Sequence, residues 1–153
     1  IMWCATLALN GLIGAGVPQD WSTHMIGHEM TALHGLDHAQ TLAIVLPATL
    51  RTRRAAKREK LLQYAARVWG LSTADETLAI EQAIEKTAAF FRAVGLPTSL
   101  KDYGISGDYA SPLLAQLKRH HMTQLGEKGD VTLETLLEVL KLCAYRADPL
   151  GRQ

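Results

Sequence analysis

Four of the six histidines in this 153-residue chain lie within one short run, THMIGHEMTALHGLDHAQ. They are His24, His28, His34 and His38. Neutral imidazole binds Zn(II) and Fe(II), and two or three imidazoles beside a carboxylate leave a position open for water or substrate. Two interpretations are open at this point. The histidines are metal ligands, or they cap helix ends, face solvent or are satisfied within the core.

The spacing of these histidines suits two consecutive helices. His24 and His28 are four residues apart, so they share one helix face about one turn apart. His34 falls at the end of that helix and His38 opens the next one, so the chain can fold His38 back toward His24. The run lacks the HExxH spacing of zinc peptidases, and Glu29 points about 100° away from its neighbour His28. A peptidase is therefore not favoured.

Helical periodicity and capping signals run through nearly the whole chain, and they predict an all-α fold. No convincing alternating strand occurs. Pro47 is expected to kink or end the helix that contains it. The expected helices cover residues 1–13, 20–34, 38–50 and 54–69, a segment from a Thr73/Glu76 capping box to a stop at Gly95–Pro97, a segment opening at Ser111–Pro112, and a segment from Thr132.

Length, composition and charge exclude several classes of protein. A chain of 153 residues that is 48% hydrophobic and 20% charged is expected to form one globular domain. The net charge of +1 provides no global field for nucleic acid or anionic lipid, so neither partner is expected. Cys4 and Cys143 stand near opposite ends of the chain without a CxxC motif, which favours a reducing compartment and a cytoplasmic location.

The opening run has no charged side chain before Asp20. A signal peptide needs a positive n-region, which this run lacks, and a membrane span would not be interrupted by Asn10, three glycines and Pro18. The favoured interpretation is an interior helix of a larger protein. Its apolar surface would then be open here, and we expect it to favour association into a homo-oligomer.

The run THMIGHEMTALHGLDHAQTLAIVLP resembles the C-terminal metal-binding signature of the iron-containing (group III) alcohol dehydrogenases. It is most similar to the NADP-dependent alcohol and aldehyde reductase branch, often called butanol dehydrogenases. The flanking runs LALNGLIGAGVPQDW, KLLQYAARVWG, FFRAVGLPTSLKDYGI and MTQLGEKGDVTL follow that branch in the same order. The resemblance covers about residues 1–146 and leaves the tail 147–153 unmatched.

This resemblance implies an all-helical domain that provides two histidine ligands to a catalytic divalent metal, either iron or zinc. The corresponding residues are His24 and His38. A further family histidine near the nicotinamide corresponds to His28, which becomes the candidate catalytic proton donor. His34 has no assigned role. The implied reaction transfers a hydride between NADP(H) and an alcohol/aldehyde pair, with the metal polarising the substrate oxygen.

The family's remaining ligands, an aspartate and a histidine of a DxxxH helix, lie upstream of the signature, as does its nucleotide-binding domain. We expect both to be missing here, with 1–146 a helical metal-binding domain that binds metal weakly and is inactive alone. Asp20 and His24 have the DxxxH spacing by coincidence, because His24 is already the signature's own ligand. The run GLIGAG at 11–16 is GxxGxG and follows a helix, so it has no phosphate-binding role.

The basic run RTRRAAKREK at 51–60 supports an alternative function, a non-catalytic helical interaction module whose histidines are remnants. Such a run can contact phosphates or an acidic partner. No aromatic residue interleaves its charges, so a solvated helix face is the favoured interpretation. A metal-dependent hydrolase lacks a well-placed general base. The sequence leaves the metal, the substrate chain length and the choice between NADH and NADPH undecided, although the branch resemblance favours NADPH.

Overall fold

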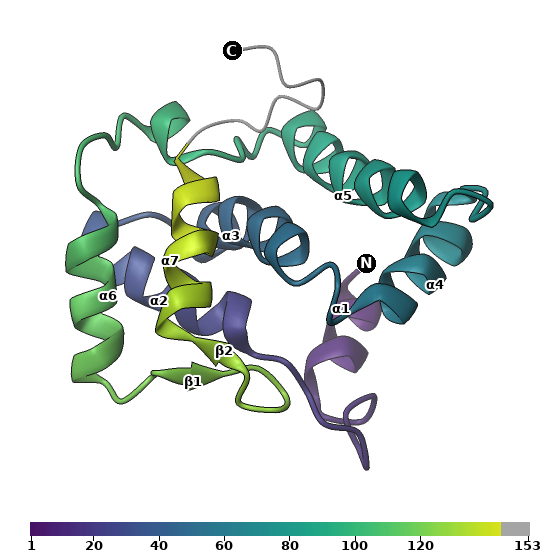
Figure 1. Cartoon of the computed structure of the whole chain (residues 1–153), viewed down its shortest axis with the longest axis horizontal. Coiled ribbons are helices and arrows are strands. Elements are labelled where there is room, and N and C mark those ends of the chain that lie inside the picture. Colours follow the sequence, from purple (N-terminus) through teal and green to yellow (C-terminus); the bar gives the residue numbers. More distant parts are fainter. Residues whose placement is uncertain (145–153) are drawn as a thin grey trace.

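The computed structural model describes residues 1–144, so the tail 147–153 and the last two residues of the expected domain lie outside the described residues. Helices dominate this part of the chain, as the sequence predicts (Figure 1). Gln124–Leu125 (β1) and Val131–Thr132 (β2) add a short antiparallel hairpin that the sequence did not predict. The helices are α1 (Met2–Leu9), α2 (Ser22–His34), α3 (His38–Thr52), α4 (Arg58–Trp69), α5 (Glu76–Ala93), a 3-10 turn (Leu100–Tyr103), α6 (Ala110–Arg119) and α7 (Leu133–Cys143).

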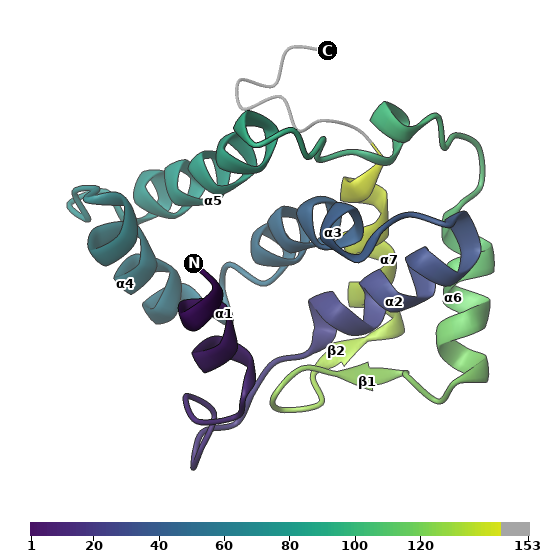
Figure 2. The same cartoon turned by 180° about the vertical axis from the view of Figure 1, so that it is seen from behind.

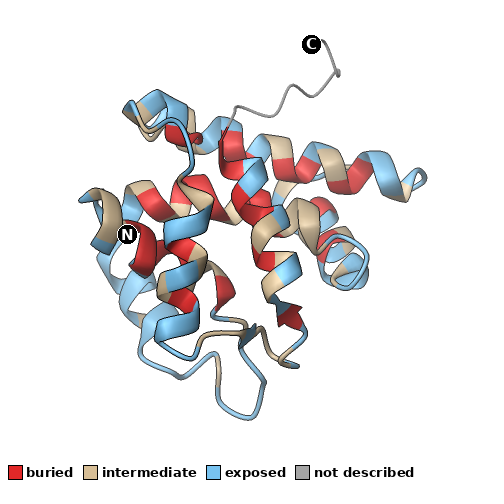
Figure 3. Ribbon diagram, turned by 60° about the vertical axis from the view of Figure 1, so that its left-hand side comes forward, coloured by how far each residue is buried: buried red, intermediate tan, exposed pale blue. Residues whose placement is uncertain are grey.

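The main body packs α2 against α3, with α7 also packed on α3 and α6 against both α2 and α7 (Figures 1 and 2). Buried residues gather where these helices meet, and exposed residues cover the outer faces (Figure 3). Because this core is built around the two histidine-bearing helices, it fixes their backbones relative to each other. Its largest buried members include Ile26, Met30, Ile44, Leu113, Leu117, Leu136 and Leu140.

The α4–α5 hairpin forms an arm that packs on α3 through α5. Its helices meet through small residues, with Ala65, Ala79 and Ala83 forming one buried cluster. Small side chains allow the two backbones to approach closely. The arm is tied to α3 by Glu85, whose two carboxylate oxygens accept from Arg51 at 3.1 Å and from Arg92 at 2.6 Å.

The first helix, α1, lies apart from this core, and none of its residues is buried. It ends at Leu9, short of the predicted 1–13, and a turn-rich connection leads from it to α2. Cys4 and Cys143 are both free thiols. No helix within residues 1–144 is long and apolar enough to cross a membrane. The exposed large apolar side chains of residues 1–21 are Ile1, Met2, Trp3, Leu9, Leu12, Ile13, Val17 and Trp21.

Two predicted helix starts are wrong, and near each of them an aspartate accepts from a backbone amide of the first turn. The N-cap of α5 is Asp75, whose carboxylate accepts from the Leu78 amide at 3.0 Å, and not Thr73. Asp108 likewise accepts from the amide of Ser111 at 3.0 Å, so that residue lies inside α6 and does not cap it. In both places the carboxylate of an aspartate two or three residues before or after the predicted cap accepts from an amide at the helix start that has no intrahelical partner.

Two further boundaries differ from the sequence prediction. Pro47 does not end its helix, because α3 continues to Thr52. Pro47 itself is buried and lies among buried neighbours, so core packing outweighs the missing backbone donor. The fourth helix begins at Arg58 rather than at residue 54, since residues 53–57 form turns. The predicted start at Thr132 is confirmed, because that residue is the N-cap of α7.

The end of α6 contains the only non-glycine residue at positive φ within residues 1–144, His121 at φ 59°. Its amide donates to the Lys118 carbonyl, and the Met122 amide donates to the Leu117 carbonyl at 2.8 Å. These paired bonds satisfy the last carbonyls of the helix, and they require a left-handed residue, which is most often glycine.

We therefore predict that His121→Gly raises the free energy of unfolding by about 1 kcal/mol, because glycine adopts this conformation without the steric penalty of a Cβ atom. Urea unfolding followed by far-UV circular dichroism measures the change. Lys118→Gly, at an exposed position of the same helix, is the control and should destabilise by about 1 kcal/mol. A loss of stability in both variants contradicts the prediction.

Candidate metal centre

Three of the four clustered histidines come together where α2 and α3 pack. The ring centroids of His24 and His38 are 5.3 Å apart, those of His28 and His38 are 5.3 Å apart, and those of His24 and His28 are 6.2 Å apart. The predicted folding of His38 back toward His24 is confirmed. The metal-binding role of these residues stays a prediction.

Local signals produce this arrangement. Gly35 ends α2 in the left-handed conformation at φ 68°, and the chain reverses within three residues. Asp37 then starts α3 through a capping box with Gln40, whose side chain accepts from the Asp37 amide at 2.9 Å. Gly27 lets the two helices approach, since a Cβ atom there would meet the Thr41 hydroxyl oxygen at 3.0 Å.

Burial favours the neutral form of His24. It lowers the pKa of this imidazole, and the charged forms of His38 and His28 lower that pKa further. A neutral ring is the form that binds a metal. His34, the last residue of α2, also has a pKa lowered by burial, and its buried Nε2 has no hydrogen-bond partner in the described part of the protein. It makes no ring contact with the other three histidines within residues 1–144.

Trp21 is a neighbour of this cluster that the sequence analysis did not identify. Its ring meets the ring of His24 edge-on, with centroids 5.0 Å apart and an interplanar angle of 67°. The side chain is 41% exposed, and its aromatic ring covers one side of His24 with an apolar surface. Its position three residues before His24, at the start of a predicted helix, is the sequence signal that could have placed it beside the histidines.

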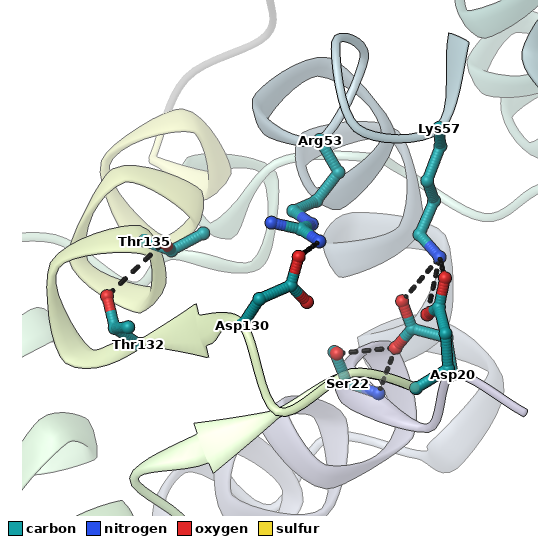
Figure 4. Close-up of polar contacts among 8 residues, drawn as sticks. Asp20, Ser22, Arg53, Lys57, Asp130, Thr132 and Thr135 are labelled. Carbon is teal, nitrogen blue, oxygen red and sulfur yellow. Dashed lines mark hydrogen bonds and ion pairs between the residues drawn. The ribbon is translucent and has the colours of Figure 1, made fainter.

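A polar cluster surrounds the start of α2 (Figure 4). Asp20 accepts from the amide and the hydroxyl of Ser22 at 2.9 and 2.5 Å, and Lys57 Nζ lies 2.8 Å from the other Asp20 oxygen. Burial alone would raise the pKa of Asp20, but the bonds from Lys57 and Ser22 outweigh it and lower that pKa to about 2. Asp20 is thus ionised and holds the start of α2. Its oxygens contact Ser22 and Lys57, so it does not act as the aspartate of a DxxxH metal site.

The basic run 51–60 is not a solvated helix face, because it spans the end of α3, a turn and the start of α4. Most of its cations face carboxylates of the same chain. Arg51 contacts Glu85, and Arg53 contacts Asp130 at 2.5 Å. Lys57 contacts Asp20 and Glu127, and Arg58 contacts Glu76. This pairing leaves little free charge for phosphate groups, so the interaction-module alternative loses its main support.

Glu29 does not join the histidine cluster. Its side chain is buried, and one oxygen lies 2.6 Å from Nδ1 of His120 at the end of α6. This contact ties α2 to α6 and agrees with the expected direction of Glu29 away from His28. No group of three or more His, Cys, Asp or Glu residues within residues 1–144 forms a metal-binding arrangement by itself.

Comparison with known proteins decides the family. The family model described as "Fe-containing alcohol dehydrogenase family, C-terminal" matches residues 1–143. The chain belongs to the iron-containing alcohol dehydrogenase family. The NADPH-dependent aldehyde reductase YqhD of Escherichia coli is 60% identical over 134 residues, which cover 88% of this chain and 35% of that protein. The NADH-dependent butanol dehydrogenase A of Clostridium acetobutylicum is 29% identical over 143 residues, covering 92% and 37%.

Solved structures of this family share the fold. The substrate- and cofactor-free aldehyde reductase YqhD of E. coli superposes with a TM-score of 0.91 at 55% identity, over 94% of this chain and 38% of that one. The NADH-dependent butanol dehydrogenase A of Thermotoga maritima gives 0.84 at 29% identity over the same shares. The predicted family and the all-α C-terminal fold are confirmed. The chain spans about a third of the length of these relatives.

The lowered pKa of Asp20 predicts a pH-dependent contribution to stability. A folded-state pKa of about 2, below the usual 3.8, stabilises the fold above pH 4 by about 2 kcal/mol. That contribution is lost as the pH falls from about 4 to about 2, because the carboxylate must then be protonated. Asp20→Asn keeps an acceptor for Ser22 but lacks the charge that faces Lys57.

We expect wild type to be more stable than Asp20→Asn by about 1–2 kcal/mol at neutral pH, with the difference falling to about 0.4 kcal/mol near pH 2. Urea unfolding of both proteins across this range measures it. If wild type and Asp20→Asn differ in unfolding free energy by the same amount at neutral pH and near pH 2, the assigned charge state of Asp20 is wrong.

Proposed function

We propose that this chain is the helical metal-binding part of an alcohol dehydrogenase or aldehyde reductase that transfers a hydride between NADP(H) and an alcohol/aldehyde pair. The observation that carries the proposal is the meeting of His24, His28 and His38 in a chain of this family. In this proposal His24 and His38 bind a divalent iron or zinc ion. His28 is the catalytic residue beside them.

The donor set suits such an ion. In a tetrahedral site with nitrogen-to-metal distances of about 2 Å, two imidazole centroids lie about 5 Å apart. The centroids of His24 and His38 are 5.3 Å apart, which is compatible with both rings facing one ion. Imidazole suits iron and zinc alike, so the residues support either metal.

The chain's own residues then have distinct roles. When bound, the divalent ion polarises the substrate oxygen as a Lewis acid and the nicotinamide cofactor carries the hydride. His28 holds or moves a proton at its ring nitrogen, from a position one helical turn beyond His24 and next to His38. Trp21, edge-on to His24, excludes water from that side of the rings.

Cofactor and substrate classes come from the relatives. The E. coli relative is named as an NADPH-dependent aldehyde reductase and the C. acetobutylicum relative as an NADH-dependent butanol dehydrogenase. We favour NADPH, because the E. coli protein is 60% identical to this chain and the C. acetobutylicum protein 29%. The substrates are then small aldehydes and alcohols.

Both relatives are much longer than this chain, and we propose that a nucleotide-binding domain and the remaining metal ligands complete the site. The two ligands proposed here are half of such a first shell. The apolar side chains of α1 offer a surface on which a further domain can pack, since none of the residues of this helix is buried.

Metal binding by the chain tests the ligand assignment. We predict that the wild-type chain binds Co(II) weakly, and that His24→Ala and His38→Ala each weaken binding at least about tenfold, because each removes one of two protein ligands. Isothermal titration calorimetry gives the dissociation constants. His121→Ala, outside the cluster, is the control and should bind as wild type does; equal affinity in all four proteins contradicts the assignment.

Turnover tests the half-site proposal. With a divalent metal, NADPH and an aliphatic aldehyde, this chain alone should cause no loss of NADPH absorbance, because the proposed nucleotide-binding part is not present to align the cofactor. The full-length E. coli aldehyde reductase is the positive control. Rapid NADPH oxidation by the 153-residue chain alone would overturn the proposal.

A further inference from the structure

Three segments that are distant in the sequence meet at Lys57. Its Nζ atom lies 2.8 Å from Oδ2 of Asp20, in the connection before α2, and 2.8 and 2.9 Å from the carboxylate oxygens of Glu127, in the turn between β1 and β2. Lys57 itself lies in the turn between α3 and α4. The three side chains are largely buried, with exposures of 19%, 16% and 25%. We call this group the Lys57 clamp.

A second contact holds the same hairpin turn in place. Arg53, also from the α3–α4 turn, pairs with Asp130 at 2.5 Å (Figure 4). Gly126 at φ 86° brings the backbone of the hairpin turn close to Ser22, since a Cβ atom there would lie 3.7 Å from the Ser22 hydroxyl oxygen. Ser22 is fully buried. The start of α2 is therefore enclosed by the hairpin turn as well as bonded to Asp20.

The clamp lies next to the histidine cluster along the chain. Asp20 bonds to both the amide and the hydroxyl of Ser22, the first residue of α2, and His24 follows two residues later. Trp21 lies between the two bonded residues and meets the ring of His24 at 5.0 Å. A shift of this first turn moves both rings together, and it changes the 5.3 Å separation of His24 and His38.

We propose that Lys57, acting through Asp20, is a positioning residue for the histidine cluster. It holds the first turn of α2 so that His24 faces His38 at the separation that suits a shared ion. The effect of Lys57 on metal affinity rests on the proposed metal-binding function. Its effect on the placement of His24 and Trp21 does not.

Removing the Lys57 ammonium group affects Asp20 most directly. Without the ammonium group, a largely buried carboxylate loses its ionic partner and is driven toward water, which pulls on the turn that Ser22 begins. Groups that orient metal ligands from outside the ligand shell change metal affinity by about 10–100-fold when removed. We expect the lower end of that range, since Ser22 still bonds to Asp20.

The test uses the full 153-residue chain with Trp3→Phe and Trp69→Phe, which leaves Trp21 as its single tryptophan. In this background, Lys57→Met should raise the dissociation constant for Co(II) about tenfold and shift the Trp21 emission in the absence of metal. Lys57→Arg keeps a cation within reach of both carboxylates and should restore both values. Arg58→Met, which removes the neighbouring surface pair with Glu76, should change neither.

Far-UV circular dichroism checks that each variant is folded. If Lys57→Met does not fold, Asp20→Asn replaces it, because this variant keeps the acceptor for Ser22 and loses only the charge that faces Lys57. A smaller loss of Co(II) affinity in the same direction is then expected. Affinity equal to that of the background protein overturns the inference.

The outcomes separate this inference from the proposed function. If the unmutated background protein binds Co(II) and Lys57→Met binds it equally well, the positioning role is wrong while the metal site stands. If the background protein binds no Co(II), the metal-binding proposal fails, and the Trp21 emission alone decides the positioning role. An emission that is identical in Lys57→Met and the background protein then overturns it.

Discussion

The close contact between α2 and α3 is the constraint on which the site depends. The helices approach each other at Gly27, where any side chain would press on Thr41. Buried residues such as Ile26 and Ile44 pack around this contact. A larger residue at position 27 would part the helices and separate the α2 histidines from His38. The chemistry proposed for the imidazoles is thus a consequence of how tightly two helices pack.

Charged residues complete this packing with contacts between segments that are distant in the sequence. Glu85 ties the α4–α5 arm to α3, Lys57 and Arg53 tie the hairpin turn to the α3–α4 turn, and Glu29 ties α2 to α6. Each partly exposed pair contributes modestly to stability, so their effect is mainly on placement. The same pairing explains how a run rich in arginine and lysine sits in a chain of almost no net charge.

The helices and the histidine cluster were predictable because their signals are local. Helical spacing, the glycine after His34 and the signature run lie within a few residues of what they determine. The Lys57 clamp was not predictable, since its ion pair with Glu127 joins residues 70 positions apart. Asp75 displaced Thr73 as a cap, and burial let α3 continue past Pro47, because tertiary packing and competing side chains outweigh single-residue propensities.

The three histidines that meet, His24, His28 and His38, belong to a single helical hairpin, α2 with α3, and the first and last of them are fourteen positions apart. Short loops close with a small loss of chain entropy, and contacts between near neighbours in sequence form early and fast. The imidazoles are therefore brought together by the most local tertiary contact of the main body. We therefore expect the cluster to form together with this hairpin, without waiting for the long-range contacts that α6 and α7 make with it.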